Sequence, residues 1–176
     1  MSPCCFETVV VGVGNTMLSD DGVGARAARA VMRDRRLRPG IAVLGEGTLG
    51  LGLLEAIAEA RHILFLDSVN CGVPPGTVVR ISGDALLDSR RERTVHQLGI
   101  ADLVTALAVV SSQTAEIVIL GMQPANGYGA GLAPPAARAA LAPLIDAAFD
   151  QLRTWQSKAK SGRRKYLHSG MISALP

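Results

Sequence analysis

The sequence predicts an α/β protein with a mostly parallel sheet that helices cover on both faces. Short apolar runs rich in β-branched residues recur without polar alternation, which is typical of strands buried on both faces. Amphipathic segments separate these runs, so that strands and helices alternate along the chain. The chain has 176 residues, 48% of them hydrophobic and 3% aromatic. These values favour one domain with a core of small aliphatic side chains.

The amino-terminal part predicts a strand, a helix and a second strand. Thr8 to Val13 reads TVVVGV and is expected to form the first strand. A helix is expected from the polar residues 19–21 to about Leu37, because apolar positions recur on one face and arginines on the other. A Pro-Gly pair ends this unit, and Ile41 to Leu44 is expected to form the second strand.

The middle of the chain repeats this pattern. Leu51 to Ala60 is expected to form an amphipathic helix, and His62 to Leu66 a third buried strand that ends at Asp67. Thr77 to Ile81 is expected to form a strand that pairs antiparallel or lies at an edge of the sheet. The arginine-rich stretch from Asp84 to Thr94 is expected to be an exposed connection.

The last part predicts one more strand between two helices. Gln97 to Val110 is expected to be helical, and Glu116 to Met122 (EIVILGM) to form a strand. A glycine-rich loop leads to a long alanine-rich helix from Pro134 to about Trp155, with proline well placed in its first turn. We therefore expect a single domain over residues 1–155, followed by a basic, flexible tail over residues 156–176.

Charge and composition limit the partners and the compartment. The net charge is +3, but six of the 18 basic residues lie beyond Asp150, the last acid, which leaves 12 basic against 15 acidic residues in the body. Without aromatic residues interleaved along the body to stack on bases, no nucleic-acid partner is expected. No apolar run approaches the roughly 18 residues that cross a bilayer, so no membrane insertion is expected. Three cysteines, an odd number, favour a reducing compartment, the cytoplasm.

Three polar residues fall where the chemistry of an open α/β sheet is expected, near the carboxyl ends of strands: Asp21, Asp67 and His96. Asp20 is expected to cap the following helix, which leaves Asp21 as a candidate ligand. Asp67 is either a hydrogen-bond acceptor that anchors a loop or a ligand, and His96 is either structural or a ligand. Two carboxylates and an imidazole suit a borderline divalent metal such as nickel or zinc, so these residues are the candidate metal ligands.

Other catalytic layouts are less well supported. The G-V-G-N segment at residues 12–15 lacks the third glycine of a dinucleotide fingerprint, since Met17 stands there, and Asp20 and Asp21 would repel phosphate. Neither G-x-S-x-G nor H-E-x-x-H occurs. His62 and His168 are not expected to join the cluster. Cys71, four residues after Asp67, could approach the crevice, but without a paired motif it is expected to be a small loop residue.

Five short motifs occur along the chain in an order that resembles the motif order of a known protein family. They read VVGVGNTMLSDDGVG (residues 10–24), GEGTLG (45–50), LDSV (66–69), PPGTV (74–78) and HQLG (96–99). Each motif is weak alone, but the ordered set is similar to that of the [NiFe]-hydrogenase maturation endopeptidases. The resemblance covers the chain from about Val9 to Leu152 and leaves out the basic tail.

The resemblance implies a three-layer α/β/α sandwich with a twisted five-stranded sheet. It implies a cytoplasmic, aspartyl-type endopeptidase that removes a carboxyl-terminal extension from the hydrogenase large-subunit precursor after nickel has entered it. Matched motif by motif, Asp21, Asp67 and His96 would recognise the nickel, which the precursor supplies. The first acid is often Glu in the family, and the shorter Asp here leaves Asp20 as a second candidate for that role.

The resemblance names no nucleophile and the sequence supplies none, so the catalytic residues stay unknown, with Asp21, Asp67 and His96 as candidates. Two alternatives stay open at this point. A metal-dependent chaperone that docks the precursor without cutting it would use the same residues. A nucleotide-binding α/β protein is the third hypothesis.

Overall fold

In the computed structural model, the chain is described over residues 6–45, 51–88, 95–111, 114–125 and 135–168. The strands are β1 (Thr8–Gly12), β2 (Ile41–Leu44), β3 (His62–Ser68), β4 (Val78–Ser82) and β5 (Glu116–Met122). The helices are α1 (Val23–Arg33), α2 (Leu51–Ile57), α3 (Gly83–Asp88), α4 (Val95–Val110) and α5 (Pro135–His168).

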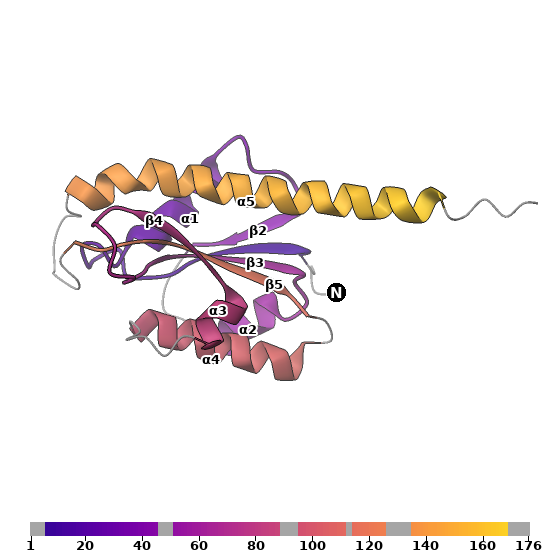
Figure 1. Ribbon diagram of the computed structural model, residues 1–176, viewed down its shortest axis with the longest axis horizontal. Coiled ribbons are helices and arrows are strands. Elements are labelled where there is room, and N and C mark those ends of the chain that lie inside the picture. Colours follow the sequence, from indigo (N-terminus) through magenta and orange to yellow (C-terminus); the bar gives the residue numbers. More distant parts are fainter. Residues whose placement is uncertain (1–5, 46–50, 89–94, 112–113, 126–134, 169–176) are drawn as a thin grey trace, which may run out of the picture.

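Within this described part, the sheet has five strands in the order β2-β1-β3-β5-β4. All neighbours pair parallel except β4, which runs antiparallel to β5 at one edge. Helices α1 and α5 cover one face, and α2, α3 and α4 cover the other (Figure 1). The predicted three-layer sandwich with a mostly parallel five-stranded sheet is confirmed.

The alternation of side chains along the strands builds a separate core on each face of the sheet. Val10 and Leu64 pack toward α1 and α5, whereas Val9 and Ile63 pack toward α2 and α4. All four side chains are fully buried. Because both faces are covered, the strands read as continuous apolar runs, which is the pattern that predicted them.

Two expectations about helices were wrong. The stretch that begins at Asp84 is not simply a connection, because Gly83–Asp88 forms helix α3. Its first turn is stabilised locally, since the backbone N–H of Ala85 donates to Ser82 Oγ at 3.3 Å. The long helix was expected to end near Trp155, but α5 continues to His168 and extends beyond the sheet (Figure 1). No strong stop signal follows Trp155, because the first glycine after it is Gly162. The rest of the predicted tail, 169–176, lies outside the described residues.

None of the described helices is both long enough and apolar enough to cross a membrane.

His62 lies at the amino-terminal end of β3, where α5 leaves the sheet. Its ring stacks on the indole of Trp155 with 4.8 Å between ring centroids. Burial lowers the pKa of His62 below the ordinary value of 6.5, and the nearby Glu116 carboxylate opposes this only in part. The folded protein therefore favours the neutral imidazole at this position.

This lowered pKa predicts acid destabilisation. The unfolded chain binds a proton at His62 at a higher pH than the folded protein does, so the free energy of unfolding should fall as pH decreases from about 6.5 through the lowered pKa. The variant His62→Phe keeps a ring against Trp155 but removes the titration. Thermal unfolding of both proteins is measured between pH 7.5 and 5.5. The melting temperature of the parent chain should fall more steeply with decreasing pH than that of His62→Phe, and equal slopes would contradict this assignment.

Candidate functional site

The carboxyl ends of the parallel strands β1, β3 and β5 meet at one edge of the sheet, and three buried acids lie there. Asp20 and Asp21 belong to the loop after β1, and Asp67 lies near the end of β3. Their exposed fractions are 0%, 3% and 0%. Because a buried carboxylate is costly unless hydrogen bonds or a cation stabilise it, three of them at one edge mark this edge as the candidate site.

The loop that carries Asp21 is folded tightly on itself. The backbone N–H of Asn15 donates to Asp21 Oδ2 at 2.8 Å. The guanidinium of Arg26 donates to the carbonyl oxygens of Ser19, at 3.0 Å, and of Thr16, at 2.8 Å. Gly14 has φ +107°, and a β-carbon there would stand 1.9 Å from the carbonyl oxygen of Asp21. The Asp21 side chain is therefore held in place by the backbone around it.

Asp20 does not cap helix α1, contrary to our expectation. The N-cap residue is Gly22, and no side chain caps the helix. Instead, the backbone N–H of Ala125, just beyond β5, donates to Asp20 Oδ2 at 2.7 Å. The carboxylate thus joins the loop after β1 to the segment after β5. Local sequence could not show this role, because the partner is 105 residues away.

Asp67 lies one residue before the end of β3, which is longer than expected and continues to Ser68. It pairs in register with Gly121 of β5. The backbone N–H of Ser68 donates to Asp67 Oδ1 at 2.7 Å. The carboxylate is therefore fixed within the sheet itself.

The loop after β1 packs directly on the end of β3. The backbone N–H of Val13 donates to the carbonyl oxygen of Leu66 at 2.8 Å. Gly24, three residues after Asp21, lies so close that a β-carbon would stand 2.0 Å from the Leu66 carbonyl oxygen. The structure thus brings the chain segments of Asp21 and Asp67 together, as the sequence predicts.

His96 is the second residue of α4, and its side chain lies outside the described residues. Among the side chains that the structure describes, no group of three or more His, Cys, Asp and Glu residues is arranged to hold a metal ion. A three-ligand site therefore needs a donor from beyond this set, and the predicted donor is His96. His62 lies at the opposite end of β3 from Asp67.

Sequence reasoning missed Gln123, which is buried directly after β5. Its Oε1 accepts from the backbone N–H groups of Cys71, at 2.7 Å, and Val73, at 3.4 Å. Its Nε2 donates to Asn70 Oδ1 at 3.0 Å. Gln123 thus holds the segment after β3 against the end of β5. A polar residue directly after an apolar strand was the available signal, the same one that pointed to Asp67.

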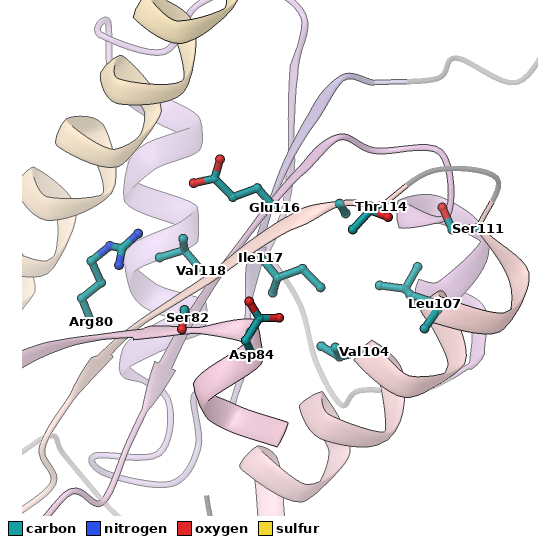
Figure 2. A pocket seen from close by; sticks show the side chains of 13 residues that line it. Arg80, Ser82, Asp84, Val104, Leu107, Ser111, Thr114, Glu116, Ile117 and Val118 are labelled. Atoms are coloured by element: carbon teal, nitrogen blue, oxygen red, sulfur yellow. The ribbon is translucent and has the colours of Figure 1, made fainter. Parts of the chain in front are cut away.

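A cavity of about 480 Å³ lies elsewhere, at the amino-terminal end of β5. Figure 2 shows Val104, Leu107 and Ile117 around this space together with the carboxylate of Asp84. Glu116 lies on its rim but pairs with Lys158 of α5, at 3.3 Å. No predicted site residue lines this cavity, so the cavity and the cluster of buried acids are separate features.

Comparison with known proteins places the chain in a family. The family model described as hydrogenase maturation protease (HycI) matches residues 25–151, well over half of the chain. The chain belongs to this family. It is therefore a hydrolase of the peptidase class, as the first of the three hypotheses expects.

Named relatives cover most of this maturation protease. The hydrogenase 2 maturation protease of Escherichia coli is 27% identical over 167 residues, which cover 93% of this chain and 99% of the relative. The hydrogenase expression/formation protein HupD of Thiocapsa roseopersicina is 27% identical over 150 residues, 83% of this chain and 67% of the relative.

Solved structures show the same fold. The hydrogenase maturating endopeptidase HybD from E. coli has a TM-score of 0.73 at 26% identity, over 84% of this chain and 93% of that one. The maturation protease HybD from Thermococcus kodakarensis has a TM-score of 0.69 at 24% identity, over 82% and 98%.

Proposed function

We propose that this protease removes the carboxyl-terminal extension of a [NiFe]-hydrogenase large-subunit precursor after nickel insertion, and that Asp21, Asp67 and His96 recognise the nickel. The observation that carries the proposal is the packing of the loop of Asp21 on the end of β3, which holds two buried carboxylates at one edge of the sheet. Membership of the family supports the class of substrate.

The chemistry of these donors suits nickel as part of the substrate. Carboxylate oxygens and an imidazole nitrogen are acceptable ligands of a borderline divalent ion. A set of three such ligands without a thiolate is expected to hold a free ion weakly, so that the ion arrives with the precursor. Once bound there, nickel would supply Lewis-acid polarisation of a peptide carbonyl. Asp21 and Asp67, fixed by backbone hydrogen bonds, would orient the precursor relative to the protease.

Two finer assignments stay predictions. The assignment to the aspartyl type of endopeptidase rests on Asp21 and Asp67, which together with His96 are the candidate catalytic residues. A cytoplasmic location rests on the odd number of cysteines. No nucleic-acid partner enters the proposal.

The proposal is tested by incubating the purified protease with precursor that has been loaded with nickel and, in parallel, with precursor free of nickel. Intact-mass spectrometry should show loss of a carboxyl-terminal peptide from the loaded precursor alone. Cleavage of neither sample would contradict the proposed substrate. Equal cleavage of both samples would contradict nickel recognition while leaving the substrate correct.

A further inference from the structure

The two edges of the sheet differ in how they are protected. Edge strand β4 follows two consecutive prolines, Pro74 and Pro75, and carries the exposed Arg80, features that discourage pairing with another strand. Edge strand β2 has the sequence IAVL, without proline or charge. Among the described residues, β2 pairs only with β1, so its other side offers backbone N–H and C=O groups to a further strand.

The surroundings of β2 favour an apolar, extended partner. Ile41 and Val43 pack on the side of α1 and α5, and Ala42 and Leu44 on the opposite side, so both faces of β2 are covered. Its free edge is paired with no strand in the part of the chain that the structure describes. Met32 of α1 is 49% exposed. Its methyl group and the aliphatic Cγ of Arg29 both lie against Gly45, the residue after β2, at 3.7 and 3.4 Å from where a β-carbon would stand. A strand added beside β2 would meet this apolar side chain.

The direction of β2 links this edge to the candidate site. β2 runs parallel to β1, so the carboxyl-terminal end of β2 lies at the same end of the sheet as the loop that follows β1 and carries Asp21. A peptidase must hold its substrate as an extended chain, and pairing with an open strand edge is a common way to do so. A segment paired with β2 would therefore lead toward the buried acids.

We propose that β2 is a docking strand, on which an extended apolar segment of the protein substrate pairs as a sixth strand beneath Met32. The inference rests on the proposed function, since the precursor is taken as the occupant. The four-residue length of β2 allows only a few hydrogen bonds, which suits a substrate that must be released.

Hydrogen exchange tests the pairing directly. Amides of residues 41–44 that point away from β1 should exchange at least about tenfold more slowly when the nickel-loaded precursor is bound. Binding and cleavage without such protection would overturn the docking strand but leave the proposed function correct. No binding and no cleavage by the parent chain would contradict the proposed function itself. Protection that rises with protein concentration in the absence of precursor would show that a second copy occupies the edge, and would overturn the inference.

A matched pair of surface variants tests the apolar contact. Met32→Glu is expected to raise KM about tenfold with little change in kcat, because it places a charge beside the docked segment. Val109→Glu is the control, since Val109 is 82% exposed on α4, on the other side of the sheet. Both variants should keep the melting temperature of the parent chain. Equal KM values for the two variants would overturn the proposed contact.

Discussion

Asp21→Asn and Asp67→Asn are each expected to lower the rate of precursor cleavage by more than about 100-fold, with little change in stability. An asparagine side chain can still accept the hydrogen bonds that these residues receive from the backbone N–H groups of Asn15 and Ser68. What each variant removes is the negative charge that would face the nickel. His96→Ala should have the same effect. Cleavage is measured by intact mass, and folding by circular dichroism.

Asp20→Asn is the matched control for this prediction. Asp20 is as deeply buried as the other two acids, but its carboxylate joins two loops through the N–H of Ala125. Asparagine can accept that hydrogen bond, so this variant should retain most of the cleavage activity. If Asp20→Asn is as inactive as Asp21→Asn, the charge of Asp20 also serves the reaction, and the assignment of Asp21 alone is wrong.

Gly24→Ala is expected to destabilise the protein by at least about 3 kcal/mol and to lower its melting temperature by roughly 6–12 °C. A β-carbon at this position would stand 2.0 Å from the carbonyl oxygen of Leu66 and 2.5 Å from that of Val13. These are backbone atoms of strand β3 and of the loop after β1, so α1 would have to move away from the sheet. Helix propensity alone predicts the opposite sign, a gain of about 1 kcal/mol for alanine over glycine.

Gly40→Ala separates crowding from backbone strain. Gly40 has φ +86°, but a β-carbon there would meet no atom within 4 Å. The free energy of unfolding should therefore fall by only about 1–2 kcal/mol, which is the cost of placing alanine in a left-handed conformation. Urea unfolding of both variants gives the two free energies. Gly24 lies in helix α1 and has no positive φ, so its loss should come from crowding alone. A loss at Gly24 no larger than the loss at Gly40 would contradict the predicted crowding.

The strands were predicted more accurately than the helix ends. The predicted bounds of β2 and β5 agree with the structure, because an apolar run flanked by polar or turn-forming residues is a local signal. Helix α1 was expected to begin among residues 19–21 but begins at Val23. Asp20 and Asp21 resemble capping residues in the sequence, but their carboxylates bond to Ala125 and Asn15 instead. No local pattern distinguishes these two uses of an aspartate.

The sequence by itself determined the α/β architecture and the end of the sheet near which Asp21 and Asp67 both lie. Both follow from short-range information, since strand and helix periods alternate and the carboxyl ends of parallel strands share an edge. Only the tertiary structure showed that Asp20 and Gln123 hold neighbouring loops together. Only the tertiary structure showed that Gly24 leaves no room for a β-carbon. These roles depend on backbone groups far away in the chain, and the distances to them are set by the packing of α1 and the loops on the sheet.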